Sequence, residues 1–348
     1  MIHGDIPVAG SNGVIGYHNI KTPISPCITI GRSGNIGTPY IYDKCWAHNT
    51  VLYIDDFKGN YPLYLYYLLK NIPLASLGGG SAVPTLNRNH IHPIEIRHCQ
   101  SLEEQKRIAG ILGALDDKIE LNRRINANVE EQAKALYKSW FVDFEPFKDS
   151  GFVDSELGPI PTGWSIGSIY TYMDVIYGAP YKSSLFNTNK KGLPLIRIRD
   201  LKTYSPQFYT EEILPNTEYI ECGDIIAGMD AEFIPCIWRG DTGVLNQRVC
   251  KFIPKYDYVS NFYIYSVIRP ELEFVQSYKT GTTVSHLGKS DIDKFKVIIP
   301  SKDVIEKYSR IADTYLAEII KIANENQRLI SLRNTLLPKL MSGEINVE

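Results

Sequence analysis

Two long stretches of the chain space their apolar residues in the same way, and this spacing restricts the possible folds more than any other feature. In the first stretch, from Ile108 to Trp140, the repeated positions follow each other at alternating steps of four and three. The second stretch shows the same steps from Tyr308 to Leu340. Sustained over several heptads, such spacing predicts long helices that pair along a seam. The residues expected to form this helix pairing are Ile108, Leu112, Leu115, Ile119, Tyr315, Ile319, Ile322 and Leu329.

The two helical stretches also indicate where they begin and how they align. Ser101 and Glu104 form the pattern of a capping box at the start of the first helix. Asn122 and Asn326 fall on the seams, where a polar residue can fix the register. A helix of roughly 36 residues is on the order of 50 Å long, at about 1.5 Å per residue. A helix that packs only on its own domain is the alternative, but the recurrence in both halves favours antiparallel pairing.

A polar loop likewise occurs twice, in residues 77–96 and 279–298. When the two stretches are aligned, Leu86 falls on Leu287 and Ile91 falls on Ile292. Each copy follows a segment rich in tyrosine and precedes a long helical pattern. The chain therefore consists of two copies of one arrangement, in which a polar loop and a short strand lead into a long helix.

The second copy of the loop contains Gly288, Lys289 and Ser290, which resemble the end of a phosphate-binding P-loop. The first glycine of that motif would have to lie at position 283, where the chain has Thr283. A P-loop must also open a helix, whereas the alternation of residues 291–300 predicts a strand. A nucleotide site is therefore not expected.

The composition limits the partners that the chain can have. With 348 residues, it can form two domains that each have a core. Its formal net charge of −2 excludes binding of nucleic acid by bulk positive charge, so such contacts need local basic patches or charge from a partner. The six cysteines include no C-x-x-C pair, which favours reduced thiols in a cytoplasmic protein. Because neither a signal peptide nor an apolar run of about 20 residues is found, no membrane association is expected.

The segment between the two helical halves is the most specific feature of the sequence. Residues 138–164 read KSWFVDFEPFKDSGFVDSELGPIPTGW, a helix end followed by a linker rich in proline and glycine. This segment resembles the connector in the specificity subunits of type I restriction–modification systems. Residues 7–16 and 28–37 are similar to the core of a recognition domain in that family, and residues 336–345, LLPKLMSGEI, are similar to its C-terminus.

The resemblance covers essentially the whole chain and implies an α+β fold. In this fold, two target-recognition domains alternate with two long helices that pair as an antiparallel coiled coil. The resemblance also implies a non-catalytic subunit that reads a bipartite site on double-stranded DNA and needs no cofactor. The implied partners are methyltransferase subunits, which dock on the helices, and restriction subunits with motor and nuclease functions. In agreement, the sequence contains no Asn-Pro-Pro-aromatic methyltransferase motif.

The repeat and the resemblance together predict the domain boundaries. We expect a first recognition domain in residues 1–100, a first helical spacer in 101–145 and a linker in 146–156. A second recognition domain follows in residues 157–300, and a second helical spacer with a tail in 301–348. By the register of the repeat, the first copy lacks about 40 residues that open the second copy. The first recognition domain is therefore expected to be incomplete at its N-terminus.

Polar and basic residues in the expected loops are the candidates for DNA contacts. Reading a sequence requires hydrogen-bonding side chains that reach base edges, and lysine or arginine side chains that bind phosphates. In the first domain the candidates are Arg32, Asn35, His48, Asn49, Arg88 and Asn89. In the second domain they are Lys182, Arg197, Arg199, Arg239, Asn246, Gln247, Arg248, Lys279, Thr282, His286 and Lys289. For each of them, ordinary surface solvation is the alternative. Arg197 and Arg199 are expected on one face of a strand.

No metal site is expected. His90 and His92 would share one face of a strand, but no pair of cysteines accompanies them. A few acidic residues could imitate a nuclease cluster, yet no lysine stands at a useful spacing, and exposed loop acids are the better interpretation. These residues are Asp224, Asp230 and Glu232.

Three alternatives to a complete specificity subunit are open. The first is an enzyme, a nuclease or an ATPase, which the missing motifs oppose. The second is a coiled-coil scaffold that binds only protein and has no preference for any DNA sequence. The third is a truncated specificity subunit in which only the second recognition domain reads DNA.

Overall fold

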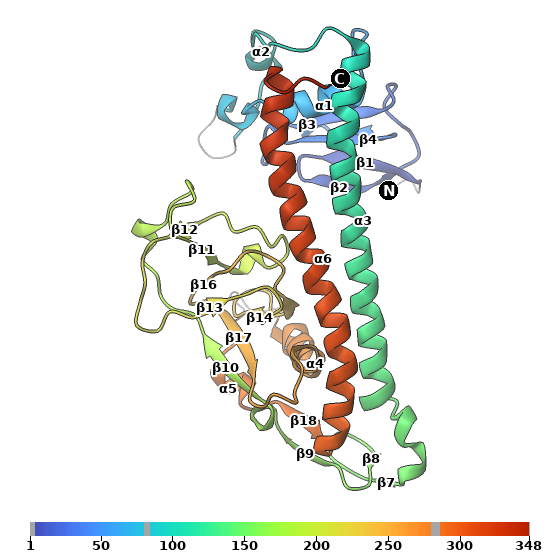
Figure 1. Ribbon diagram of the computed structural model, residues 1–348, viewed down its shortest axis with the longest axis vertical. Coiled ribbons are helices and arrows are strands. Elements are labelled where there is room, and N and C mark those ends of the chain that lie inside the picture. Colours follow the sequence, from blue (N-terminus) through green and yellow to red (C-terminus); the bar gives the residue numbers. More distant parts are fainter. Residues whose placement is uncertain (1–3, 80–83, 280–285, 348) are drawn as a thin grey trace. The chain divides into compact units, whose positions relative to one another are not determined.

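The structure of the protein is a computed structural model that describes residues 4–79, 84–279 and 286–347 (Figure 1). The chain divides into two compact units by its internal contacts. Unit 1 comprises Met1–Glu120 and Leu329–Glu348, and unit 2 comprises Leu121–Arg328. Each unit therefore contains one part of each long helix.

The two long helices are α3 (Leu102–Phe141) and α6 (Lys302–Ser342), and they pair within each unit (Figure 1). In unit 1, Leu112 near the start of α3 belongs to the same buried cluster as Leu337 near the end of α6. In unit 2, the Nδ2 group of Asn122 donates a hydrogen bond of 3.0 Å to Oδ1 of Asn326. Early residues of one helix thus meet late residues of the other, which confirms the antiparallel pairing.

The residues proposed for the helix seam differ in their burial. Five of them are buried: Ile108, Leu112, Ile119, Ile319 and Ile322. The other three are half-buried: Leu115, Tyr315 and Leu329. The asparagines of the seam make polar contacts across it, since Asn126 Nδ2 also donates to the carbonyl oxygen of Ile319 at 3.2 Å. At the start of α3, the hydroxyl of Ser101 accepts the N–H of Glu104 at 3.4 Å, which is one half of the expected capping box.

An acidic residue of α3 organises the polar contacts of the helix pair in unit 1. Asp116 accepts hydrogen bonds from Arg333 Nη1 at 2.6 Å and from the hydroxyl of Tyr67 at 2.8 Å. The ammonium of Lys70 lies 3.7 Å from the same carboxyl. Burial favours a raised pKa for Asp116, but the hydrogen bond from Arg333 and the charge of Lys70 outweigh it, so the pKa is lowered.

The lowered pKa predicts that unit 1 loses stability in acid. A carboxyl whose pKa is depressed by folding contributes stability above its unfolded pKa of about 3.9, and this contribution disappears as the pH falls through the folded value. Asp116→Asn should therefore lower the free energy of unfolding by about 2 kcal/mol at pH 7, and the difference from the wild type should shrink towards pH 3. Unfolding of both proteins by urea between pH 3 and 7 measures this. Asp117→Asn, at the neighbouring exposed position, is the control and should show no such difference.

Unit 1 contains two three-stranded sheets. The first has the order β2-β1-β5 and the second has the order β4-β3-β6. The strands are β1 (Ile6–Gly10), β2 (Gly13–His18), β3 (Cys27–Gly31), β4 (Pro39–Tyr42), β5 (Trp46–Ala47) and β6 (Val51–Tyr53). The short helices are α1 (Pro62–Lys70), η1 (Leu74–Leu77) and α2 (Arg88–Ile91). Buried residues of α1, among them Tyr64 and Tyr67, pack against Ile108 and Leu112 of α3.

Unit 2 is larger and has two four-stranded sheets, with the orders β10-β17-β14-β15 and β12-β11-β16-β13. Their strands are β10 (Met173–Tyr177), β11 (Leu193–Ile196), β12 (Tyr209–Thr210), β13 (Tyr219–Ile220), β14 (Ile225–Gly228), β15 (Cys236–Ile237), β16 (Gly243–Leu245) and β17 (Val249–Pro254). The two-stranded pairs are β7 (Phe152–Val153) with β8 (Ile160–Pro161), and β9 (Ser165–Ser168) with β18 (Lys296–Ile299). The remaining helices are η2 (Glu145–Ser150), η3 (Ile169–Thr171), η4 (Ser183–Leu185), η5 (Ile198–Asp200), α4 (Asn261–Lys279) and α5 (Lys289–Ile292).

Helix α4 forms the centre of the unit 2 core (Figure 1). Its buried residues contact β14 and β17. The ring of Tyr263 also lies 5.9 Å from that of Tyr308 on α6. Trp164 closes one end of this core, with its ring 6.0 Å from Phe141 and 4.9 Å from Phe147. The sheet is thus joined to the long helices through aromatic packing.

The two units share a framework of backbone contacts, as the sequence repeat predicts. In unit 1, the N–H of Leu86 donates to the carbonyl oxygen of Arg32 at 2.8 Å. In unit 2, the N–H of Leu287 donates to the carbonyl oxygen of Met229 at 2.7 Å. The strands follow the same plan, since β1 lies between antiparallel β2 and parallel β5, and β11 lies between antiparallel β12 and parallel β16.

The framework differs at one edge of the corresponding sheets. In unit 2, β17 pairs with both β10 and β14. In unit 1, β6 occupies the place of β17 and pairs with β3. Within residues 4–79, no further strand pairs with β6. Accordingly, β6 is an edge strand, whereas β17 lies inside its sheet.

The strand expected over residues 291–300 is only partly correct. Residues Lys289–Ile292 form the helical turn α5, and the strand β18 begins at Lys296. The reason is a local cap, because Asp291 Oδ2 accepts the backbone N–H of Gly288 at 2.8 Å. In the first copy the cap has the opposite arrangement, because the side chain of Asn87, which precedes α2, accepts the N–H of Asn89 at 3.0 Å. His90 consequently lies on a helical turn, and the expected strand face shared with His92 is wrong.

Candidate nucleic-acid interface

A cleft of about 440 Å³ in unit 2 gathers polar side chains from separate segments of the chain. These segments include the start of η5 after β11, the loop between β16 and β17, the residue Asp230 after β14 and the stretch around η4. Five residues that the sequence suggested for DNA contacts line the cleft: Arg197, Arg199, Asn246, Gln247 and Arg248. The fold therefore brings together residues about 50 positions apart in the chain.

The turn η5 replaces the strand that was expected to carry Arg197 and Arg199. Asp200 Oδ2 accepts the backbone N–H of Arg197 at 3.0 Å, and this bond closes the turn. Asp200 is buried, and burial raises the pKa of its carboxyl. The guanidinium of Arg197 lies 5.2 Å from the ring centre of Phe208. The interpretation of residues 197–200 as a strand is therefore wrong, because a backbone hydrogen bond to a buried carboxyl bends the chain there.

The loop between β16 and β17 presents two exposed side chains. The N–H of Asn246 donates to the carbonyl oxygen of Ile196 at 3.1 Å, and the N–H of Val249 donates back to the carbonyl oxygen of Asn246 at 2.9 Å. Asn246 itself is buried. Gln247 and Arg248, which follow it, are exposed. Two backbone bonds thus fix the loop and leave the side chains of Gln247 and Arg248 available.

The repeated loop reaches the same cleft through Asp230. Asp230 Oδ1 lies 2.7 Å from Nδ1 of His286, and its Oδ2 lies 3.3 Å from Nε of Arg248. The backbones of Asp230 and His286 also form a bridge. Asp230, which sequence reasoning treated only as an exposed acid, therefore connects two of the candidate residues.

The lysine candidates have different surroundings. Lys182 and Lys289 are exposed. Lys279 binds Asp291 Oδ2 at 2.6 Å and the carbonyl oxygen of His286 at 2.7 Å. It therefore holds the ends of the repeated loop together. Thr282 lies outside the residues that the structure describes.

Arg239, another residue predicted to contact DNA, does not line the cleft. Its side chain is only 16% exposed and forms an ion pair with Glu130 of α3. The guanidinium also lies 5.6 Å from the ring centre of Tyr204. Because its charge is offset by the half-buried carboxylate of Glu130, Arg239 joins the recognition sheet to the helix.

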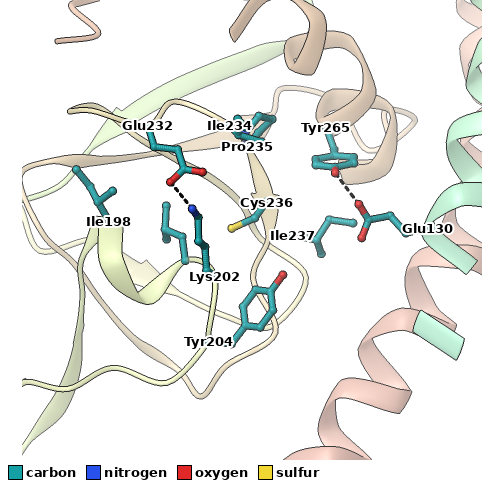
Figure 2. A pocket seen from close by; sticks show the side chains of 11 residues that line it. Glu130, Ile198, Lys202, Tyr204, Glu232, Ile234, Pro235, Cys236, Ile237 and Tyr265 are labelled. Atoms are coloured by element: carbon teal, nitrogen blue, oxygen red, sulfur yellow. Dashed lines mark hydrogen bonds and ion pairs between the residues drawn. The ribbon is translucent and has the colours of Figure 1, made fainter. Parts of the chain in front are cut away.

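Glu130 was missed by sequence reasoning because it lies on the helix rather than in a loop. It borders a second cavity of about 250 Å³, where Figure 2 shows it beside Tyr265 and apart from the pair of Lys202 and Glu232. The hydroxyl of Tyr265 donates to Glu130 Oε1 at 2.6 Å, and Lys134 lies 2.9 Å from the same atom. Burial favours a raised pKa for Glu130, but these hydrogen bonds and the charge of Arg239 lower it.

In unit 1, the candidate residues lie on the equivalent loops. The N–H of Val51 donates to the carbonyl oxygen of His48 at 3.1 Å, which repeats the bond between Val249 and Asn246. His48 is half-buried, and its Nδ1 lies 3.0 Å from the hydroxyl of Thr50. The remaining candidates are exposed: Arg32, Asn35, Asn49, Arg88 and Asn89.

Other kinds of site find little support in the described structure. Over residues 4–79, 84–279 and 286–347, no three His, Cys, Asp or Glu side chains form a group that could hold a metal ion. Asp224 is not the exposed acid that was expected, because it is half-buried and lies 2.9 Å from Lys251 Nζ. None of the helices in the described part of the chain has the length and apolar character needed to cross a bilayer.

Comparison with known proteins connects this arrangement to one family. The family model of the type I restriction modification DNA specificity domain matches residues 3–131 and 173–332. The specificity subunit of the type I restriction enzyme MjaIX from Methanocaldococcus jannaschii is 30% identical over 318 residues, covering 82% of this chain and 69% of that protein. The HindI specificity subunit from Haemophilus influenzae is 24% identical over 311 residues, covering 70% and 67% respectively.

The fold agrees with these matches. The crystal structure of a type I restriction–modification S subunit from M. genitalium superposes with a TM-score of 0.50 at 15% identity, covering 98% of this chain and 90% of that chain. Its mixed helix and sheet architecture is the one described above, with two recognition domains and two long antiparallel helices. The chain therefore belongs to the family of type I restriction–modification specificity subunits, the non-catalytic subunits that recognise DNA in these systems.

Proposed function

We propose that the chain reads a bipartite site on double-stranded DNA, and that the cleft of unit 2 reads one part of it. The observation that carries this proposal is the convergence of three arginines and two amides in that cleft. Arginine binds guanine through two hydrogen bonds, and asparagine or glutamine binds adenine in the same way. With a net charge of −2, the chain as a whole does not attract DNA, so DNA binding depends on local groups of arginines such as this one.

The equivalent loops of unit 1 are proposed to read the other part. Support comes from the shared backbone framework, in which His48 and Asn49 stand where Asn246 and Gln247 stand in unit 2. The exposed residues Arg32, Arg88 and Asn89 are suited to contact phosphates or bases. In this proposal, residues 1–100 and 157–300 are the recognition domains, while 101–145 and 301–348 are the helical spacers.

The helical spacers are proposed to dock methyltransferase subunits, and through the complex also restriction subunits, in the cytoplasm. Both long helices expose apolar side chains that the helix pairing does not cover. On α3 these are Ile111, Leu121 and Ile125, and on α6 they are Ile311 and Leu332. Exposed apolar side chains of this kind are characteristic of surfaces that bind another protein.

The experiment that tests the DNA-reading function is genome-wide detection of N6-methyladenine in cells that express the chain with its cognate methyltransferase subunit. A motif with two specified parts around a fixed gap would support two reading domains. A motif with one specified part, or a palindrome of that part, would restrict reading to one domain. Absence of any motif would contradict the proposal and favour a protein-binding scaffold.

Arg248→Ala should relax the part of the motif that unit 2 reads. A bidentate contact between arginine and a base discriminates against the wrong base by about 1–3 kcal/mol, or about 5- to 150-fold. Loss of the side chain should therefore broaden one position of the methylated motif while leaving the other part unchanged. Lys296→Ala removes an exposed cation of β18 that does not line the cleft and serves as the control. An unchanged motif in the Arg248→Ala variant would remove this residue from the reading surface.

A further inference from the structure

The contact between Asp230 and Arg248 is the feature of the cleft that most restricts the ligand it can bind. Both oxygens of the Asp230 carboxylate have neighbours, since Oδ1 lies 2.7 Å from His286 Nδ1 and Oδ2 lies 3.3 Å from Arg248 Nε. The side chain of Asp230 is 30% exposed, whereas that of Arg248 is 54% exposed. The carboxylate is thus the inner member of the pair, and the guanidinium is the outer one.

The contact at Nε determines which donors Arg248 can offer. The guanidinium is a rigid planar fork, so an anion close to its Nε edge favours one orientation of the whole group. The two terminal amino groups then remain for a ligand. A pair of parallel donors in one plane matches the O6 and N7 acceptors of guanine in the major groove.

The same contact makes Arg248 poorly suited to a phosphate. Binding to phosphate depends mainly on net positive charge and the release of counterions. The charge of Arg248 is largely offset by Asp230, which is 3.3 Å away. Hydrogen bonds from Arg248 to a base remain possible when its charge is offset by Asp230, because they depend on the orientation of the N–H donors. Arg197 and Arg199, elsewhere in the cleft, are better suited to bind the DNA phosphates.

We propose that Arg248 forms a guanine-binding subsite in the cleft of unit 2, and that Asp230 is the positioning residue that orients it. This inference rests on the proposed function of reading DNA and specifies one base that is read. It applies to unit 2 alone. In unit 1, the N–H of Arg32 donates to the carbonyl oxygen of Thr50, just as the N–H of Met229 donates to that of Arg248. Thr50 therefore occupies the position of Arg248, so unit 1 has no guanidinium at this position.

The first test compares methylated motifs in cells that express the wild type, Asp230→Asn or Arg248→Ala with the cognate methyltransferase subunit. The wild-type motif must contain a G·C pair in one of its parts. In both variants we expect the preference for that pair to fall by about 10-fold or more, while every other position keeps its preference. Glu232→Gln is the matched control, because Glu232 lies two residues further on, pairs with Lys202 and borders the other cavity.

The second test needs no substitution in the subsite. The wild-type chain, assembled with its methyltransferase subunits, is titrated with duplexes in which each guanine of the motif is replaced in turn by 7-deazaguanine. This analogue lacks the N7 acceptor but pairs normally. One replacement should weaken binding by about 5-fold, the effect expected for one hydrogen bond. The same replacement should have no effect on binding by the Arg248→Ala complex.

The outcomes separate the inference from the proposed function. If the wild type produces no methylated motif, the proposed function itself fails. If a motif exists but its unit 2 part contains no guanine, or if 7-deazaguanine has no effect at any position, the guanine subsite is wrong. A uniform loss of methylation at all positions in Asp230→Asn, with the base preferences unchanged, would show that Asp230 only supports the fold.

Discussion

Replacing Ile319 by aspartate should strongly destabilise unit 2. Ile319 is fully buried in the core that joins α6 to α4, and its carbonyl oxygen accepts the hydrogen bond from Asn126. A carboxylate in this position would lose its hydration without gaining a partner, which costs several kcal/mol. Since whole domains are stable by only about 5–15 kcal/mol, we expect a loss of about 4 kcal/mol or more. Urea unfolding followed by circular dichroism measures the loss.

Ile311→Asp is the matched control for this substitution. Ile311 lies on the same helix, but its side chain is 40% exposed. The introduced carboxylate stays hydrated there, so the free energy of unfolding should change by less than about 1 kcal/mol. Equal effects of the two substitutions would contradict the orientation of α6 in unit 2.

Glu130→Ala should destabilise unit 2 nearly as strongly. Glu130 and Arg239 form an ion pair in which the side chains are only 17% and 16% exposed. Removal of one partner from a buried pair leaves the other charge without compensation and typically costs about 3–5 kcal/mol. The hydroxyl of Tyr265 would lose its acceptor as well. We expect a lower midpoint of thermal unfolding and faster hydrogen exchange in β15 and in the loop that follows it.

Two further variants separate this effect from a general loss of charge on the helix. Glu131→Ala changes the next residue of α3, whose side chain is 72% exposed and pairs only with Lys134 among the described ion pairs. Its effect should stay below about 0.5 kcal/mol. The double variant Glu130→Leu with Arg239→Met replaces the pair by apolar side chains and should recover much of the lost stability. If the double variant is less stable than Glu130→Ala, Arg239 has another buried partner.

The long helices could be predicted from the sequence because their determinants are local and periodic. Apolar residues at alternating steps of four and three form one apolar face on α3 and one on α6. This face predicts a packed helix even when the residues that pack against it are not known. The repeated loop was equally visible, because Leu86 and Leu287 keep the same position relative to their helices. Periodicity failed over short segments. The N–H groups of Arg197 and Gly288 each donate to a carboxylate three residues further on, and the resulting turn replaces the strand at residues 197–200 and the first residues of the strand expected over 291–300.

The sequence predicted which loops carry the candidate site, but it did not predict which of their side chains contact one another or other parts of the fold. Arg197, Asn246 and Arg248 share one cleft because the parallel pairing of β11 with β16 brings their ends together. Arg239 appeared equivalent to them in the sequence. Its carboxylate partner, Glu130, precedes it by more than 100 residues and lies on a helix. A local sequence pattern does not indicate an ion pair between residues so far apart in the chain. Whether a loop arginine is paired with a carboxylate or faces solvent is therefore known only from the folded structure.

The backbone framework shared by the two units has a consequence for how such proteins change over time. The loops of both units are held by hydrogen bonds between main-chain atoms, from Leu86 to Arg32 and from Leu287 to Met229. At some equivalent positions of the surface the side chains differ, as with Thr50 and Arg248. Hydrogen bonds between main-chain atoms do not depend on the identity of the side chain. Point mutations in these loops can therefore change the side chains that the surface presents while the main-chain bonds that hold the loops are kept.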